Sequence, residues 1–189
     1  MATTASVRTT VPLLTYDDLD FIPQEREGDR HELFDGVLIV TPSPIPAHQL
    51  LTIRCVGRFE VATDGWSLGQ VYTAPIDVVF ASKLVAVPDL VYVARDRLSI
   101  VGPKAIEGAP DLIVEILSPS TKRRDLRAKR ALYERFGVRE YWLVDPKARS
   151  VTVLVLRGDV YEPLPPADVV TSTVLPGLAV DLADLFAGI

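Results

Sequence analysis

The sequence predicts an α/β (α+β) protein in which a mixed central sheet is flanked by helices. Residues 85–94 and 111–117 are short apolar runs with the alternation typical of strands. Residues 139–156 form two further strand-like runs that are joined by a tight turn. Residues 47–62 instead carry an apolar side chain at every fourth position, which indicates an amphipathic helix.

The length and composition are those of an ordinary globular protein. A chain of 189 residues fits one domain, and we expect 1–12 to be a flexible tail and 13–186 the folded core. The content of 48% hydrophobic and 24% charged residues is enough for a sizeable core. The net charge of −5 argues against a broad basic surface that coats nucleic acid, but it leaves room for a local basic patch.

The rare residues exclude several classes of protein. Cys55 is the one cysteine, so internal disulfides are impossible and a reducing, cytoplasmic setting is expected. His31 and His48 are too few for a zinc cluster of the usual kind. The N-terminal stretch lacks the apolar segment of a secretory signal, and no run reaches the roughly 18 apolar residues of a membrane span.

The first half of the chain begins with a short helix and a hairpin. Thr15 followed by Asp18 predicts a capped short helix that ends near Leu19. Strands over 32–34 and 37–40 flank Asp-Gly, the strongest two-residue hairpin signal. The helix over 47–62 follows Pro46, which suits a first helical position.

The remaining elements follow from breakers and apolar runs. We expect one strand over 71–80 and a short helix or loop over 95–109. Hydroxyl residues at 118–121 stop the strand before them and start a helix over 122–136, which Gly137 ends. Residues 182–186 predict a short terminal helix.

Acidic side chains interrupt the two central apolar runs. Asp89 shares a strand face with Val91 and Val93, and Glu115 shares one with Ile113. Carboxylates are almost never buried without a partner or a metal. Two of them converging from neighbouring strands suit a hard divalent cation. The alternative is a solvated sheet face or a salt bridge.

The helix after Glu115 adds a lysine. Asp125, Lys129 and Tyr133 are spaced four residues apart and therefore stack on one helix face. A lysine aimed at a metal-bound water could stabilise charge on phosphate oxygens, whereas Asp125 and Lys129 could equally form a surface ion pair. We expect the neighbouring arginines to face solvent or phosphate: Arg123, Arg124, Arg127, Arg130 and Arg135.

Two residues of the first half are weaker candidates. Glu32 starts the early hairpin and would by itself be read as a surface residue. His48 lies at a helix start, where it could touch a phosphate. The interpretation of His48 as a solvent-facing histidine is favoured.

In order along the chain, the motifs HELFDG, PIDVVF, VPDLVYV, APDLIVEILSPST, D-x3-K-x3-Y and GVREYWLVDP resemble the Uma-two family of restriction-endonuclease-like proteins. The resemblance extends over residues 15–186. It implies the PD-(D/E)XK nuclease fold. It also implies that Glu32 is the early acid, Asp89 the acid of the Pro-Asp motif and Glu115 the acid of the E-x-K motif.

One position departs from the superfamily pattern. Leu117 stands two residues after Glu115, where the pattern has lysine. The resemblance implies that the lysine has moved to the following helix, at Lys129. Asp111 also follows a proline and shares the face of Glu115, so it is an alternative metal ligand to Asp89.

The resemblance implies hydrolysis of phosphodiester bonds, with DNA as the expected substrate. Asp89, Glu115 and the backbone carbonyl of Ile116 would hold Mg²⁺ or Mn²⁺. Lys129 would steady the nucleophile, and Glu32 would act on a second cation or on water. We expect Lys122 and Arg123, with His48 as a weaker candidate, to contact phosphate.

The sequence is also compatible with two other functions. A binding or regulatory protein could keep the fold without catalysis, because Leu117 replaces the expected lysine. A subunit that serves assembly is the second alternative, since the apolar C-terminal segment could pair with another copy. We therefore also expect a homo-oligomer, with a dimer favoured.

Overall fold

The computed structural model describes residues 13–23, 28–65 and 67–189. The expectation of a flexible tail over 1–12 lies outside the described residues. None of the helices in the described part is long and apolar enough to cross a membrane.

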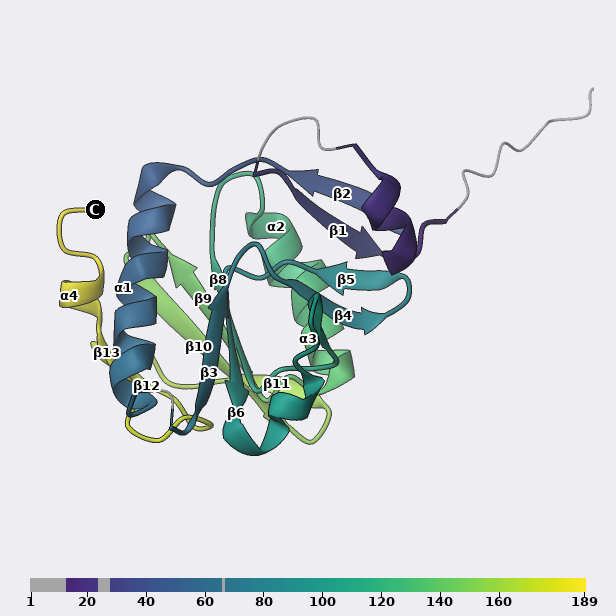
Figure 1. Ribbon diagram of the computed structural model, residues 1–189. Coiled ribbons are helices and arrows are strands. Elements are labelled where there is room, and N and C mark those ends of the chain that lie inside the picture. The colour runs from purple at the N-terminus through teal and green to yellow at the C-terminus, as the bar shows by residue number, and fades with distance from the viewer. Residues whose placement is uncertain (1–12, 24–27, 66) are drawn as a thin grey trace, which may run out of the picture.

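A six-stranded mixed sheet runs through the centre of the molecule in the order β11-β10-β9-β8-β6-β3 (Figure 1). Strands β8 and β9 are parallel, and the other neighbours are antiparallel. Its strands are β3 (Gly69–Thr73), β6 (Leu90–Ala94), β8 (Leu112–Ile116), β9 (Glu140–Asp145), β10 (Ser150–Arg157) and β11 (Val160–Pro163).

A second mixed sheet has five strands in the order β2-β1-β5-β4-β7. Only β4 and β7 are parallel within it. Its strands are β1 (Arg30–Phe34), β2 (Val37–Thr41), β4 (Asp77–Ala81), β5 (Leu84–Ala86) and β7 (Ala105–Glu107). Strands β12 (Val169–Thr171) and β13 (Ala179–Asp181) pair separately near the C-terminus.

The long helix α1 (Pro46–Ala62) and the helical segment over 122–136 lie close to their predicted positions. Helix α1 begins at the expected proline. Residues 122–136 are helical throughout, but the middle is a π-turn rather than α-helix. The bounds of the others are η1 (Tyr16–Phe21), η2 (Arg95–Ile100), α2 (Lys122–Arg124), the π-turn η3 (Asp125–Lys129), α3 (Arg130–Phe136) and α4 (Leu182–Leu185).

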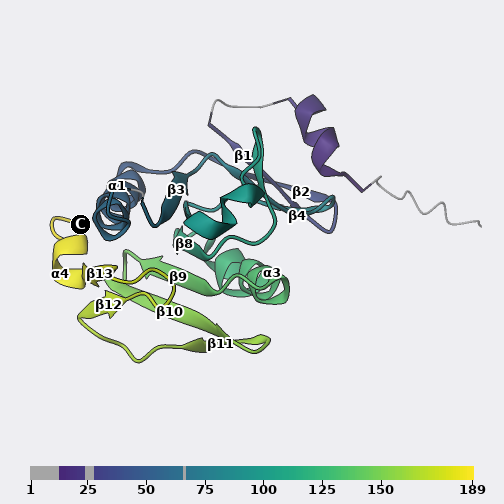
Figure 2. The same cartoon turned by 60° about the horizontal axis from the view of Figure 1, so that its bottom comes forward.

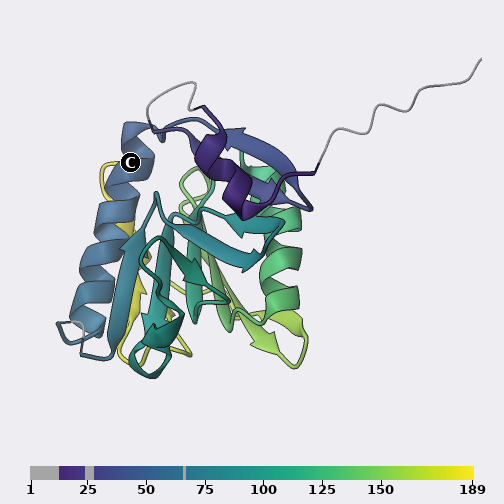
Figure 3. The same ribbon diagram turned by 45° about the vertical axis from the view of Figure 1, so that its right-hand side comes forward.

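The six-stranded sheet is covered on both faces, which buries β6 and β8 completely apart from a strand end (Figures 2 and 3). Helix α1 and the C-terminal elements pack on one face, where Leu112 and Val114 meet Leu51 and Phe59. Helix α3 and the second sheet pack on the other face, which includes Ile113. The alternation predicted for β8 is therefore confirmed.

Two predicted strands are each split between the two sheets. The run 71–80 divides into β3 and β4, and the run 85–94 divides into β5 and β6. Pro75 lies in the first break and Pro88 in the second. A proline offers no N–H to a strand ladder, so it suits the points where the chain leaves one sheet for the other. The second break places Asp89 directly before β6.

The turn signals are confirmed by the backbone. Asp35 and Gly36 have φ angles of 51° and 78°, as a two-residue hairpin between β1 and β2 requires. Gly137 follows α3 in the left-handed region, with φ of 80°. The carboxylate of Asp18 accepts hydrogen bonds from the N–H and hydroxyl of Thr15, the predicted cap of η1.

The β9–β10 hairpin and the C-terminus belong to the core. Trp142 is 1% exposed and packs against Phe59, so the prediction that this hairpin is scaffold is confirmed. Leu175, Leu178 and Phe186 are buried in the same cluster. The apolar C-terminal segment thus packs against the protein's own sheet. The expected homo-oligomer stays a prediction.

Candidate active site

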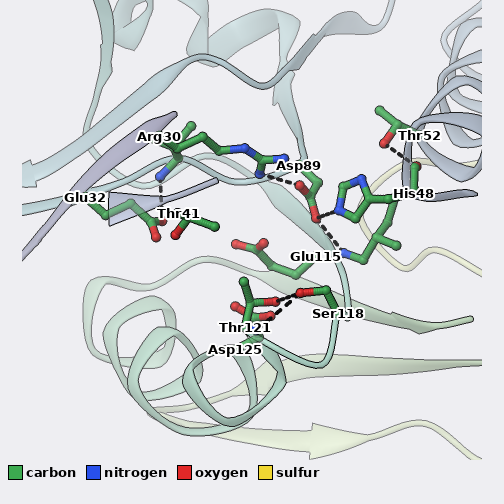
Figure 4. Close-up of polar contacts among 12 residues, drawn as sticks. Arg30, Glu32, Thr41, His48, Thr52, Asp89, Glu115, Ser118, Thr121 and Asp125 are labelled. Atoms are coloured by element: carbon green, nitrogen blue, oxygen red, sulfur yellow. Dashed lines mark hydrogen bonds and ion pairs between the residues drawn. The ribbon is translucent and has the colours of Figure 1, made fainter. Parts of the chain in front are cut away.

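A cavity of about 240 Å³ opens where the two sheets meet the start of the helix over 122–136. Glu32 enters it from β1, Asp89 from the turn before β6, and Glu115 from β8. Asp125 and Lys129 enter from the π-turn. Figure 4 shows the carboxyl groups of Glu32, Asp89, Glu115 and Asp125 in one region, with the oxygens of Asp89 directed at Arg30 and His48. The structure therefore brings Glu32, Asp89, Glu115 and Lys129 together, as the sequence predicted.

Glu115 is held by two groups from the following helix. Its Oε1 accepts a hydrogen bond of 2.7 Å from Lys129 Nζ and one of 2.8 Å from the Tyr133 hydroxyl. Tyr133 is fully buried, which fixes the position of the carboxylate. Leu117, two residues along β8, is packed in the core instead of reaching the cavity.

Lys129 supplies the cation that Leu117 cannot. Its ammonium lies 2.7 Å from Glu115, 2.9 Å from Glu32 and 3.8 Å from Asp125, and the residue is 2% exposed. The surface ion pair that spacing alone allowed is therefore excluded, because Asp125 and Lys129 both point inward. A π-turn changes which side of a helix its residues face and often marks a functional site.

Asp89 is surrounded by donors. Its Oδ1 lies 2.5 Å from Arg30 Nη1, while its Oδ2 lies 3.0 Å from His48 Nε2 and accepts a 2.7 Å bond from the Ile116 N–H. This last bond ties the turn before β6 to β8. His48 is only 9% exposed, so the expectation of a solvent-facing histidine was wrong.

Glu32 joins the second sheet to the site. Its Oε1 accepts a 2.9 Å bond from the Val87 N–H, and its Oε2 lies 3.1 Å from Arg124 Nη2. Arg124 also donates to Thr41 at the end of β2. Arg124 therefore points into the cavity, contrary to the expectation that the arginines of this helix face solvent or phosphate.

Burial and crowding shift the ionisation of these groups. Burial raises the pKa of Glu115 to about 8; Lys129 opposes this shift, and nearby Asp125, Asp89 and Glu32 add to it. Burial opposes ionisation of Asp89 too, but His48, Arg30 and the Ile116 N–H bring its pKa down to about 2. Burial disfavours the charged form of Lys129, yet Glu115 and Glu32 raise its pKa above the usual value.

The donor set suits a hard cation. Four buried carboxylates face three permanent cations, Arg30, Arg124 and Lys129. Asp125 Oδ1 is buried without a hydrogen-bond partner, so this oxygen is available as a ligand for a cation. Within residues 13–23, 28–65 and 67–189, however, no three metal-binding side chains stand close enough together to hold an ion as they are. Binding would require Asp89 or Glu115 to turn from its present partners.

Other predicted site residues lie outside the cavity. Asp111 precedes β8 at the end away from Glu115, where it pairs with Arg97 and Arg139. It is thus not placed to replace Asp89 as a ligand. Lys122 pairs with Asp145 near the surface, and Arg123 is exposed on the same helix.

Sequence reasoning missed Arg30 and the inward position of Arg124. Arg30 could have been found, because it precedes Glu32 by two residues and strand alternation puts both on one face. Nothing in the helical spacing distinguishes Arg124 from Arg123 as a cavity residue. Their difference depends on the distance to Glu32, which is 92 residues earlier in the chain.

Comparison with protein families gives a match over residues 15–183 to the family Uma2, described as "Putative restriction endonuclease". The chain belongs to the Uma2 family. The resemblance of the sequence motifs is thereby confirmed. A comparison with curated proteins gives no match.

Among solved structures, the chain is similar to a nuclease-like protein of Anabaena variabilis, described as "a putative nuclease belonging to DUF820". The TM-score is 0.74, and the alignment covers 92% of this chain and 98% of that one at 23% identity. This likeness confirms the nuclease-like fold, with mixed sheets flanked by helices. Uma2 membership adds that the protein is of a nuclease family, a class that typically uses divalent metals.

Proposed function

We propose that this protein is a metal-dependent endonuclease that hydrolyses phosphodiester bonds, with DNA as its substrate. The observation that carries the proposal is the position of Lys129. Its ammonium lies 2.7 Å from Glu115 although Leu117 occupies the usual lysine position. A buried lysine among acids from three separate elements has a high cost in desolvation, which a catalytic role explains.

Asp89, Glu115 and the backbone carbonyl of Ile116 would hold Mg²⁺ or Mn²⁺. Asp125 is a further oxygen ligand within the same cavity. When bound, the cation would lower the pKa of a water molecule that it holds and would polarise the phosphate. Oxygen-only donors are those that both ions prefer.

The protein's own cations would act on the phosphate. Hydrolysis forms a bond from the water oxygen to phosphorus, breaks the bond to one sugar oxygen, and leaves that oxygen with a proton. Lys129 would orient the attacking water and stabilise the developing negative charge. Arg30 keeps Asp89 ionised and in place, while Glu32 holds the Lys129 ammonium at 2.9 Å. Lys122 and Arg123 would contact phosphates further along the strand.

The test compares Lys129→Ala with Glu115→Ala on circular single-stranded and plasmid DNA in the presence of Mn²⁺. Lys129→Ala should lose about 100-fold or more in cleavage but keep Mn²⁺ binding by calorimetry. Glu115→Ala should lose both. Lys104→Ala is the matched control, since this exposed lysine pairs with Asp20 outside the cavity.

Folding must be separated from chemistry. Lys129→Ala leaves buried acids without their cation, so each variant is also followed by thermal unfolding. Lys129→Arg keeps the charge but displaces the donor, and it should fold while cleaving poorly. Full activity in Lys129→Ala would refute the role of this lysine.

A binding protein that has lost catalysis is the second candidate function. It is favoured by Asp89, whose two oxygens are already occupied by Arg30, His48 and the Ile116 N–H. Absence of Mn²⁺ binding and of cleavage in the unmutated protein, together with binding of DNA, would establish it over the nuclease.

A further inference from the structure

Two hollows meet at Asp89. The first is the active-site cavity of about 240 Å³, and the second is a hollow of about 260 Å³ beside α1. They share Arg30, Pro44, His48 and Asp89. The carboxylate of Asp89 therefore lies at the junction of two spaces, between the guanidinium and the imidazole.

The reacting groups are too deeply buried to be reached by a substrate that only lies against the surface of the protein. Asp89 is 3% exposed, Glu115 2% and Lys129 2%. A phosphate can reach them only by entering a hollow. In a continuous duplex each phosphate is part of a rigid, wide rod, which cannot enter cavities of a few hundred Å³. A single strand can place one phosphate at the junction and one nucleotide on each side.

The walls of the second hollow suit a nucleobase. The exposed Gln49 brings an amide group to this hollow, and Thr52 and Ile53 line it from the same helix, α1. Ile53 is 68% exposed, so its apolar surface is open to a base. Ile45, which is 63% exposed, offers a similar surface at the first hollow. Sites for unpaired bases usually stack them on aromatic side chains; here the aliphatic side chains of Ile45 and Ile53 would provide the apolar contact surface.

The distribution of charged side chains also favours a single strand over a duplex. Proteins that bind duplex DNA commonly contact about 6–10 phosphates. This chain has a net charge of −5, and its exposed Lys122 is paired with Asp145. The guanidinium groups that a strand would meet, those of Arg30 and Arg124, are instead gathered inside the first cavity. Such an arrangement fits one or two phosphates rather than a long duplex.

We propose that the substrate is cut where it is unpaired, with consecutive nucleotides of a single strand in the two hollows on either side of Asp89. This inference rests on the proposed nuclease function and adds the class of substrate. Single-stranded DNA, flaps and loops are substrates, whereas continuous duplex is not.

The first experiment compares four DNA molecules of the same sequence with the unmutated protein and Mn²⁺. They are a circular single strand, a linear duplex, the duplex with an unpaired bubble, and the duplex with a flap. Cleavage of the single strand should exceed that of the duplex by at least about tenfold, and cuts in the last two should fall within unpaired DNA. Equal rates on single strand and duplex would overturn the inference while leaving the nuclease function intact.

The second experiment tests the hollow beside α1. Ile53→Glu places a negative charge on the proposed path of the strand and should raise KM for single-stranded DNA several-fold. Binding of a labelled oligonucleotide in Ca²⁺, followed by fluorescence anisotropy, should weaken in parallel. Val61→Glu is the matched control, because Val61 is 81% exposed on the same helix and lines neither hollow. Both variants should melt at the unmutated temperature.

Equal effects of Ile53→Glu and Val61→Glu would show that the hollow is not on the path of the strand, and would overturn the inference. A circular single-stranded RNA is included to test whether the sugar must be deoxyribose. Cleavage of RNA alone would support the proposal that the substrate is unpaired and would replace DNA by RNA as the substrate. Failure to cut any nucleic acid would refute the proposed function and this inference with it.

Discussion

Asp111 directly precedes β8 and Glu115 lies within it, and both are buried, but their carboxylates have different partners. Asp111 is paired at 2.7 Å with Arg97 and at 2.5 Å with Arg139, and it accepts a hydrogen bond from the Ala94 N–H. Its charge is fully matched. Glu115 shares one lysine with Glu32 and Asp125.

We propose that this difference separates a structural acid, Asp111, from a functional one, Glu115. A buried carboxylate with a complete set of donors stabilises the fold, whereas a surplus of buried negative charge is maintained at the expense of stability. Burial and neighbouring acids raise the pKa of Glu115 to about 8. Groups perturbed in this way gather where a protein binds ions or performs chemistry.

The largest expected effect is on activity at the Glu115 end. Glu115→Gln should reduce cleavage by more than the roughly 10–100-fold that loss of an outer partner of a metal site costs. Asp111→Asn, compared at equal folded concentration, should cleave like the unmutated protein. Initial rates on a labelled oligonucleotide provide the measurement, and equal losses in the two variants would erase the distinction.

The second prediction concerns stability, which should depend on Asp111. Asp111→Asn removes the charge that two arginines share, and should lower the free energy of unfolding by about 1–3 kcal/mol. The loss is less than for a fully buried pair, because the side chains of Arg97 and Arg139 are 35% and 50% exposed and can be rehydrated. Urea unfolding measures it. An unchanged midpoint would mean that Asp111 is not the structural acid.

The pH dependence sharpens the comparison further. Unfolded Glu115 loses its proton near pH 4.5, but the folded protein retains it to about pH 8 because burial raises the pKa. The contribution of Glu115 to stability therefore falls as pH rises through this window. In EDTA, Glu115→Gln should gain stability relative to the unmutated protein between pH 5 and pH 8. Parallel profiles would contradict the shift.

The smallest effect is expected at the surface pair of Lys122 and Asp145. Lys122 is half exposed, so water screens the interaction, and Lys122→Ala should change the free energy of unfolding by no more than about 0.5 kcal/mol. The salt dependence of DNA binding should fall by about one unit of slope if Lys122 contacts a phosphate. An unchanged slope in a salt titration would remove Lys122 from the interface.

Local patterns determined much of this protein in advance. The Asp-Gly turn, the four-residue spacing in α1 and the glycine after α3 each depend on near neighbours, so their elements could be read from the sequence. The acids within β8 and before β6 were visible because charge is out of place in an apolar run. The shared face of Asp125, Lys129 and Tyr133 follows from helical geometry, and so does the possibility of a lysine beside Glu115.

Tertiary structure decided which side chains complete the cluster. Strands 71–80 and 85–94 looked continuous, and only the formation of two sheets shows that each is divided at a proline. Burial of His48, and the inward turn of Arg124 toward Glu32, depend on segments far apart in the chain. Sequence periodicity reports which face of an element is buried. The partners that neutralise a buried charge are set by long-range packing, and periodicity carries no information about them.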